Sequence, residues 1–427
     1  MGILASLYTG VSGITGQGEA LSVYGDNIAN ASTNGFKISR PEFQDVLSKS
    51  LKGTLGGNQI GRGVKLAAVT PVFSQGSVLQ TDSPTDLAIN GDGFFVLRGQ
   101  DGQSYTRNGA FHFDREGKLV NADNYRVLGF LADDAGAITS KLGEISVDRG
   151  VIDAKKTSNV DLFLNLDLRA DIRKVFDPTR PEESSHFSTG VTVYDTAGTA
   201  HVVSLCFNKT DDGVWTWRAM AKGEELVNGK SGALVECAVG QLMFDTDGRL
   251  KEQKIQRSDF NFNKGALPNQ KISFNFGADK SSGGEGVQVT QYGSSSEAYK
   301  THQDGFTAGT LAGMAFNDDG VLTAMYSNGE NLNLCQIAVG KFEAPEGLFK
   351  AGQSRFKESR LSGQPTIGSP QTGGRGRISS KTIESSTTDI AQEFVNLMQA
   401  QRNFQANSKV VSTADEMLQD VLNLKRT

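Results

Sequence analysis

The sequence predicts a multidomain, mainly β protein, with two β-rich domains, one inserted in the other, and α-helices at both chain ends. The 427 residues exceed the size of one ordinary domain, since domains usually hold about 100–200 residues. Between the ends, short apolar runs alternate with turn residues, and the chain has 50 glycines against 9 prolines. At the ends, apolar residues instead recur at alternating steps of three and four, as in amphipathic helices that pack together.

Both chain ends carry an apolar stripe with a repeat of 3.5 residues. The N-terminal stripe consists of Leu4, Leu7, Val11, Ile14, Leu21 and Ile28. The C-terminal stripe consists of Ile383, Ile390, Phe394, Leu397, Phe404, Val411, Leu418 and Leu422. Because this is the coiled-coil period, we expect residues 1–30 and 380–427 to form a helical polymerisation domain, a coiled-coil-like inner layer.

Glycine weakens the expected N-terminal helix. Gly10, Gly13, Gly16 and Gly18 each cost about 1 kcal/mol relative to alanine, or about 4 kcal/mol together. An isolated helix of this length is marginal in water even without that burden. We therefore expect the segment to be disordered in the free monomer and to fold only against partners. The glycines would provide either close helix approach or flexibility.

The middle of the chain changes to the pattern of strands. Residues 31–70 are expected to form an extended connector, because Ser50–Gly63 is rich in glycine and poor in apolar residues. From about Val69 the apolar pattern has a period of two. One phrase then recurs: an apolar residue, Asp or Asn, two residues, Gly, one residue and usually an apolar residue. It occurs at Phe113–Leu119, Phe244–Leu250 and Phe316–Leu322, and more loosely at Ala132–Ile138 and Tyr194–Ala200.

Each copy of this phrase predicts a β-hairpin turn. The Asp or Asn side chain closes the turn through a hydrogen bond to the nearby backbone, and Gly supplies the positive φ. A calcium loop is the alternative for Asp-rich turns. We favour turns, because no copy has the spaced ligands and terminal Glu of an EF-hand.

The strand pattern is nested. A second strand-rich block runs from Val151 to Gln291, and the earlier phrasing returns at Phe316. This nesting predicts an inner β domain of residues 71–150 and 295–370, interrupted by an outer β domain of residues 151–294.

Composition argues against several function classes. The net charge of −5 lacks the basic face that nucleic acid requires. No run approaches the roughly 18 apolar residues of a membrane span, and Met1–Ser6 lacks the basic start of a secretory signal. The three cysteines and four histidines show no metal-site spacing, and no nucleophile elbow occurs. We therefore expect no catalysis, no cofactor, no metal site, no nucleic-acid partner and no membrane insertion.

Two long motifs at opposite ends resemble those of the flagellar rod and hook axial proteins. The first is Asn27-Ile28-Ala29-Asn30-Ala31-Ser32-Thr33-Asn34-Gly35-Phe36-Lys37, and the second joins Glu393–Met398 to Gln401–Lys409. Ser385–Asp389 departs from the Ser-Asn-Val-Asp-like phrase that is common in this family. The resemblance implies an assembly site that contains Asn27, Asn30, Thr33, Gly35, Phe36, Lys37, Phe394, Leu397, Gln401, Arg402, Phe404 and Asn407.

Within this family, the insert resembles that of the hook members. Val191–Asp195 and Leu242–Asp245 look like their outer domain, and Phe342–Leu348 looks like their return through the inner β domain. The resemblance implies a structural subunit of the flagellar hook, a flexible tubular universal joint that transmits torque from rod to filament. A related axial protein such as a distal rod subunit is the first alternative. A β-rich enzyme or carbohydrate-binding protein is the second.

The resemblance also implies partners and a location. The expected partners are further copies of the chain, rod proteins, the hook cap and hook-filament junction proteins, and the flagellar type III export apparatus. The chain would be made in the cytoplasm and exported without a cleaved signal peptide to the extracellular hook, attached to the basal body. Some relatives join subunits through a Cys-derived residue and a Lys. Cys206 is the candidate here, although its strand could equally bury it as a small hydrophobe.

Overall fold

The computed structural model divides the chain into two compact units. Its described residues are 2–46, 49–50, 59–147, 150–173, 175–227, 229–263, 265–278 and 284–424. One unit, which we call the terminal unit, comprises residues 1–148, 313–324 and 331–427. The other, the inserted unit, comprises residues 149–312 and 325–330. The predicted fold class, mainly β with helices at both ends, is confirmed.

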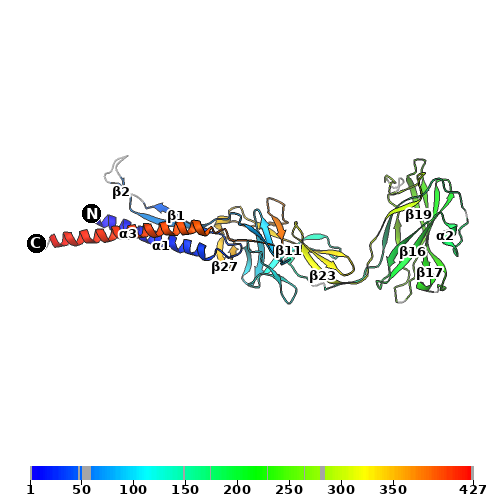
Figure 1. Cartoon of the computed structure of the whole chain (residues 1–427), viewed down its shortest axis with the longest axis horizontal. Helices are drawn as coiled ribbons and strands as arrows, with labels where there is room; N and C mark the ends of the chain where they lie inside the picture. Colours follow the sequence, from blue (N-terminus) through cyan, green and yellow to red (C-terminus); the bar gives the residue numbers. More distant parts are fainter. Residues whose placement is uncertain are drawn as a thin grey trace. The chain divides into compact units, whose positions relative to one another are not determined.

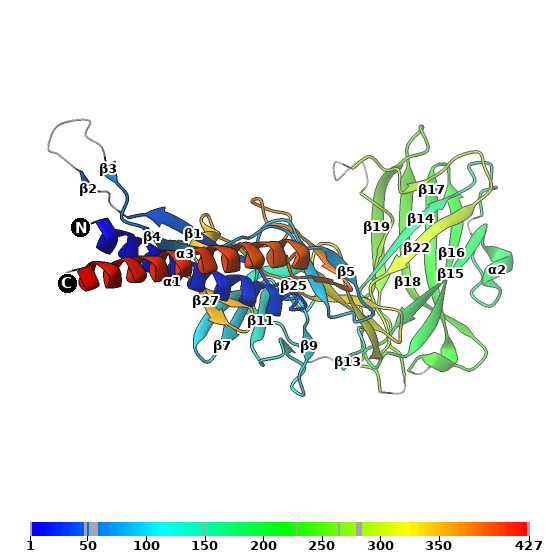
Figure 2. The ribbon, with the colours of Figure 1, turned by 60° about the vertical axis from the view of Figure 1, so that its left-hand side comes forward.

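Two long helices belong to the terminal unit. Helices α1 (Gly2–Ala29) and α3 (Ile390–Leu424) lie side by side and run antiparallel (Figures 1 and 2). Neither is apolar enough, within the described residues, to cross a membrane. The coiled-coil-like supercoil expected for them stays a prediction.

Part of the range expected to be an extended connector, 31–70, is folded as strands. Strands β1 (Ser39–Asp45) and β4 (Val64–Pro71) form an antiparallel two-stranded sheet that packs against α1. The short strands β2 (Lys49–Ser50) and β3 (Gln59–Ile60) pair with each other. The glycine-rich stretch expected to be a linker lies mostly outside the described residues, which omit 51–58.

The β domain of the terminal unit has an apolar core on both faces of its sheet. Its strands are β5 (Val78–Gln80), β6 (Leu87–Asn90), β7 (Phe94–Gly99), β8 (Gly102–Thr106), β9 (His112–Phe113), β10 (Leu119–Val120), β11 (Arg126–Ala132), β12 (Ile138–Glu144), β25 (Asn331–Ile337), β26 (Val339–Lys341), β27 (Phe349–Gly352), β28 (Arg355–Lys357), β29 (Thr366–Gly368), β30 (Arg377–Ser380) and β31 (Thr382–Glu384), with the 3-10 turn η3 (Pro345–Gly347). The main path is antiparallel in the order β25-β11-β7-β8-β28-β27. Along β7, Phe95 and Leu97 join one apolar cluster, while Phe94 and Val96 join another. Successive side chains of a strand point to opposite faces, so the two clusters lie on either side of the sheet.

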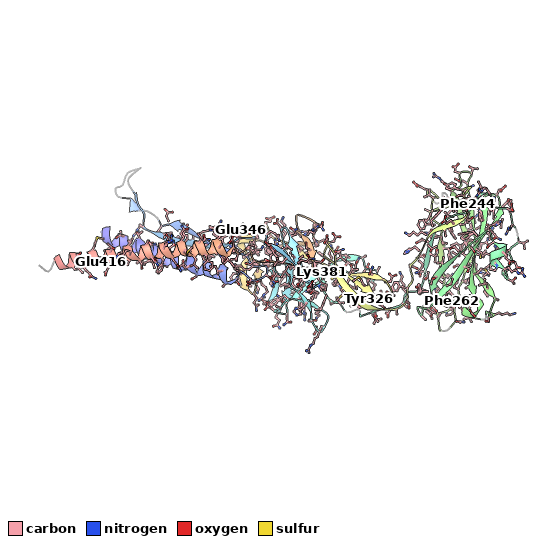
Figure 3. All side chains as sticks on the ribbon, in the orientation of Figure 1. Phe244, Phe262, Tyr326, Glu346, Lys381 and Glu416 are labelled. Atoms are coloured by element: carbon pink, nitrogen blue, oxygen red, sulfur yellow. The ribbon has the colours of Figure 1, made fainter. Side chains whose placement is uncertain are left out.

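The inserted unit is built on a five-stranded antiparallel meander in the order β15-β16-β17-β18-β19. Its elements are β13 (Val151–Ile152), β14 (Asn159–Asn165), α2 (Pro181–Ser184), β15 (Phe187–Tyr194), β16 (Ala200–Asp211), β17 (Val214–Lys222), η1 (Gly223–Glu225), β18 (Leu234–Phe244), β19 (Leu250–Ser258), β20 (Ser273–Asn275), β21 (Val289–Thr290) and β22 (Glu297–Gln303). Both tryptophans, Trp215 and Trp217, are fully buried in its core, with Phe262 (labelled in Figure 3) in the same cluster.

The end of the inserted unit differs from the expected boundary at residue 294. Strand β22 follows that boundary and still pairs with β14, from Val160–Gln303 to Asn165–Glu297. Two further strands, β23 (Gly309–Phe316) and β24 (Val321–Tyr326), contribute residues to both units.

All five repeated phrases are turns between paired strands, as predicted. At Asp114, the side-chain Oδ1 accepts hydrogen bonds from the backbone N–H groups of Glu116 (2.8 Å) and Lys118 (2.9 Å). Gly117 follows with a φ of 74°. The side chains of four further residues accept the same two hydrogen bonds, from the N–H groups two and four residues ahead. They are Asp133, Asp195, Asp245 and Asn317. One side-chain oxygen of each phrase therefore closes a turn, which is the role that the turn prediction gave it.

The C-terminal helix begins later than expected, so the helix prediction was wrong for residues 380–389. Ile383, which the sequence placed on the helical stripe, lies in β31, paired with Leu79 of β5. Lys381, labelled in Figure 3, has a φ of 53° and separates β30 from β31. Asp389 then caps α3, because its Oδ1 accepts hydrogen bonds from Ala391 N (2.9 Å) and Gln392 N (3.2 Å). Such a cap satisfies N–H groups that a first helical turn leaves open.

Candidate assembly site at the paired chain ends

The segment after α1 docks closely on the β domain. Gly35 has a φ of 66°, and a Cβ there would lie 2.5 Å from Asn108 N. Its own N–H donates to the carbonyl of Glu384 (2.8 Å). Only glycine combines this backbone conformation with such a close approach, which explains the Asn-Gly-Phe sequence at this point.

Three other residues of the N-terminal motif shape the same segment. Asn30 Nδ2 donates to the carbonyl oxygen and the carboxylate of Asp26, and Thr33 Oγ1 donates to Asn30 Oδ1. These hydrogen bonds hold the turn that immediately follows α1. The Phe36 ring lies 5.3 Å from the ammonium of Lys350, a cation–π contact with the β domain.

Lys37, Arg107 and Glu384 form a buried ion cluster. The Lys37 ammonium lies 2.6 Å from Glu384 Oε1, and both side chains are 0% exposed. It also donates to the Ser74 carbonyl. Arg107 Nη1 lies 3.4 Å from Glu384 Oε2, and Gly76 N donates to Glu384 Oε1 (2.7 Å). Burial lowers the pKa of both cations, and the negative charge of Glu384 opposes that shift.

The ion cluster connects three parts of the chain. Its members come from the N-terminal motif, the β domain and β31 just before the C-terminal helix. Two cations share one carboxylate, so loss of Glu384 would leave buried positive charge without a counter-ion. The cluster therefore holds both chain ends on the β domain.

Asn27 connects α1, β1 and α3. Its amide nitrogen donates to the Ser39 carbonyl (2.8 Å) and to Glu393 Oε2 (3.2 Å), and its amide oxygen accepts from Ser39 N (2.9 Å). Asn27 is 1% exposed and Glu393 is 5% exposed. Burial, with a smaller contribution from Glu393, raises the pKa of the neighbouring Tyr24.

The residues of the C-terminal motif divide between two faces of α3. Leu397, Phe404 and Asn407 are partly covered within the single chain, while Phe394, Gln401 and Arg402 are exposed. Asn407 lies against α1: a Cβ at Gly13 would be 2.6 Å from its amide nitrogen. The motif thus contributes both to the helix pair and to its outer surface.

The contact between the helices combines small residues of α1 with Val411 of α3, which belongs to the predicted apolar stripe. A Cβ at Gly10 would lie 2.8 Å from Val411 Cγ2, and Ala20 is fully buried. Leu4 and Val11 of the predicted stripe are 52% and 43% exposed. At Gly10 and Gly13 the glycines therefore permit close helix approach, one of the two roles that the sequence allowed.

Large apolar side chains remain uncovered along both helices of the single chain. They are Leu4, Tyr8, Val11, Ile390, Phe394, Val395, Met398, Val410, Met417 and Leu422. Burying such side chains gains about 1.5–3 kcal/mol each, and this concentration of exposed large apolar residues indicates an interaction site.

Sequence reasoning missed three buried charged residues of the site. Glu384 and Arg107 lie in the ion cluster, and Glu393 contacts Asn27. Arg107 stands in a recognisable Tyr-Thr-Arg-Asn-Gly phrase, but only its burial shows its role. A glutamate at the first turn of a helix usually faces solvent and the helix dipole, so the burial of Glu393 gives no sequence signal.

Cys206 lies on β16 in the interior of the meander and is 2% exposed. Its neighbours across the sheet are Ser188 and Arg218. Among the described residues, no group of three or more His, Cys, Asp or Glu side chains is arranged to hold a metal ion.

Four family models match successive parts of the chain. They are the flagella basal body rod protein (7–37), the flagellar hook protein FlgE/F/G D1 domain (88–159), the flagellar basal body protein FlaE D2 domain (164–306) and the flagellar basal body rod FlgEFG protein C-terminal region (379–424). Two of these matches coincide with the paired chain ends, and the FlaE D2 match falls entirely within the inserted unit.

Several relatives that match over nearly their whole length share one name. The flagellar hook protein FlgE of Borreliella burgdorferi is 32% identical, with 99% of this chain and 100% of the relative covered. The FlgE proteins of Brucella suis (31%, 100% of both chains) and Escherichia coli (29%, 97% and 98%) agree. The crystal structure of Helicobacter pylori flagellar hook protein FlgE2 is 14% identical, covers 72% of this chain and 100% of that chain, and has a TM-score of 0.53. It therefore shares the fold.

The paired chain ends and the family models together define a flagellar axial protein. Since full-length relatives at about 30% identity are hook proteins, the chain belongs to the flagellar hook protein family.

Proposed function

We propose that the chain is a structural, non-catalytic subunit of the flagellar hook, which polymerises into a tube through its paired terminal helices. The observation that carries this is the row of uncovered apolar side chains on α1 and α3. A second copy is the occupant that fits them, because the family's members form axial structures and because apolar side chains are exposed near the start of α1 and along the length of α3. The tube would act as a flexible joint between rod and filament.

The remaining assignments follow from the family. Rod proteins and the hook cap and junction proteins would contact the tube at its two ends, and the export apparatus would deliver the chain to the extracellular hook. The motif residues would have two tasks. Those from Asn27 to Lys37 fix the helices on the β domain, while exposed residues such as Phe394, Gln401 and Arg402 contact neighbouring copies.

Phe394→Asp tests the polymerisation surface. Phe394 is 49% exposed in the single chain, so the variant should fold normally and lose only contacts with other copies. Burying an unpaired carboxylate at a subunit contact costs several kcal/mol, and the loss repeats at every subunit. Electron microscopy under polymerising conditions should therefore show no tubes, whereas the control Phe394→Leu should form them. Normal tubes from folded Phe394→Asp would contradict the proposal.

A further inference from the structure

Two contacts that involve a polar side chain, which we call the polar contacts, lie between α1 and α3. At one, the Asn407 amide sits where any side chain on Gly13 would be, with 2.6 Å from a Cβ at Gly13 to Asn407 Nδ2. At the other, Asn27 Nδ2 donates to Glu393 Oε2 at 3.2 Å. Both contacts differ in chemistry from the alanines and half-buried apolar residues around them.

The two contacts have the same spacing on both helices. Gly13 and Asn27 are fourteen residues apart on α1, and Glu393 and Asn407 are fourteen apart on α3. Fourteen residues are close to four turns of a helix, or about 21 Å, so each pair returns to one face. Because the helices are antiparallel, a single alignment satisfies both contacts at once.

Small residues lie midway between the polar contacts. Ala20 is seven residues from both Gly13 and Asn27, and Ala400 is seven from both Glu393 and Asn407. Ala20 is 0% and Ala400 3% exposed, so this alignment places the two alanines opposite each other. Alanine against alanine permits close approach but discriminates poorly between alignments.

A shift of one helix by seven residues would break both polar contacts. Asn407 would then face Ala20 or Ser6, and in the first case would meet a Cβ where Gly13 has none. Glu393 would face Ala20 or a position beyond the end of α1, leaving a carboxylate that is 5% exposed without its partner. Buried charge and buried amides without partners are strongly disfavoured, as at the single buried Asn that fixes coiled-coil alignment.

We propose that the Gly13–Asn407 and Asn27–Glu393 contacts fix the register of α1 on α3. Apolar side chains tolerate several alignments, whereas these two contacts permit one. The register decides which exposed apolar side chains of the two helices lie next to each other, and so which surface the next copy meets. In this respect the inference rests on the proposed function.

Disulfide trapping in polymerised protein tests the register. Ala20→Cys with Ala400→Cys reports the proposed alignment. Ala20→Cys with Asn407→Cys reports the alignment shifted by seven residues and itself removes the Gly13–Asn407 contact, so that only the Asn27–Glu393 contact opposes the shift. After mild oxidation, mass spectrometry of peptides identifies each bond separately from the native cysteines. With Glu393 unchanged, the first bond should exceed the second at least about tenfold.

Removing both polar contacts should abolish this preference. When Glu393→Leu is added to the Ala20→Cys, Asn407→Cys chain, the yield of the 20–407 disulfide should rise at least about fivefold. When Glu393→Leu and Asn407→Leu are added to the Ala20→Cys, Ala400→Cys chain, the yield of the 20–400 disulfide should fall by a similar factor. Glu393→Gln, which can still accept a hydrogen bond from Asn27, should keep the 20–400 bond. The inference is overturned if the 20–400 bond fails to form in the unchanged background, or if it persists equally without both contacts, or if Glu393→Gln abolishes it. Failure of the unchanged chain to form tubes would instead count against the proposed function.

Discussion

Removing the charge of Glu384 should strongly destabilise the terminal unit. Its carboxylate is fully buried, 2.6 Å from Lys37 and 3.4 Å from Arg107. Glu384→Gln keeps the size of the side chain and an acceptor for the Gly76 N–H, but leaves two buried cations without an anion. Breaking a buried ion pair by removing one partner costs about 3–5 kcal/mol. We therefore expect the free energy of unfolding of the terminal unit to fall by about 3 kcal/mol or more.

Hydrogen exchange read by mass spectrometry would measure this loss locally. Peptides that cover β30 and β31 should exchange about a hundredfold faster or more, since each 1.4 kcal/mol is a factor of ten. The inserted unit provides an internal reference, because it contains both Trp215 and Trp217. Their fluorescence transition in guanidinium should stay in place.

Glu116→Gln is the matched control for the loss of a glutamate charge. Glu116 is 69% exposed and pairs with Lys118 at 3.1 Å, so the change should cost less than about 1 kcal/mol. Adding Lys37→Met to Glu384→Gln should recover part of the loss, because one buried cation leaves with the anion. Unchanged exchange of β30 and β31 in Glu384→Gln would refute the stabilising role of the cluster.

Other features give shorter tests. Limited proteolysis of the monomer should trim the helical ends and leave a core that retains Lys37, because the buried ion cluster holds this residue on the β domain. Uniform resistance of residues 1–30 would contradict the expected disorder of the glycine-rich helix. Ile152 pairs directly with Gly309, so residues 153–308 can be replaced by an Asn-Gly turn. The variant should still form tubes, but with altered bending. Loss of tubes from folded protein would show that the inserted unit is needed for assembly. Burial raises the pKa of Cys237 to about 11 and of Cys335 to about 12, so neither thiol should be alkylated at pH 8 until the protein unfolds. Boiled tubes should run as monomer, because Cys206 is 2% exposed, and a ladder of multimers would instead reveal the cross-link.

Local chemistry explains which parts of the fold the sequence predicted. The turns at Asp114 and its counterparts were predictable because each Asp or Asn bonds to N–H groups two and four residues ahead. The helices were predictable from periodicity alone. Ile383 was misplaced because its position fits both the helical stripe and the strand that pairs with β5.

The candidate site was predictable only in part, because its contacts join distant positions. Arg107 and Glu384 are 277 positions apart, and no local pattern indicates that they meet. The sequence also could not show that two faces of α1 have different tasks. Gly10 and Gly13 lie in the contact with α3, while Leu4 and Val11 remain exposed.

The ion cluster also makes docking of the N-terminal motif depend on a segment that is synthesised much later. Lys37 and Glu384 are 347 positions apart, so during synthesis the lysine has no counter-ion in the cluster until residue 384 has been added. Before that, the Lys37 ammonium lacks the carboxylate that pairs with it in the interior. An unpaired charge is more stable in water than buried. In a chain that lacks β31, the N-terminal motif would stay undocked even if the other β strands had folded. The late arrival of the Glu384 carboxylate thus decides when the N-terminal motif can dock on the β domain.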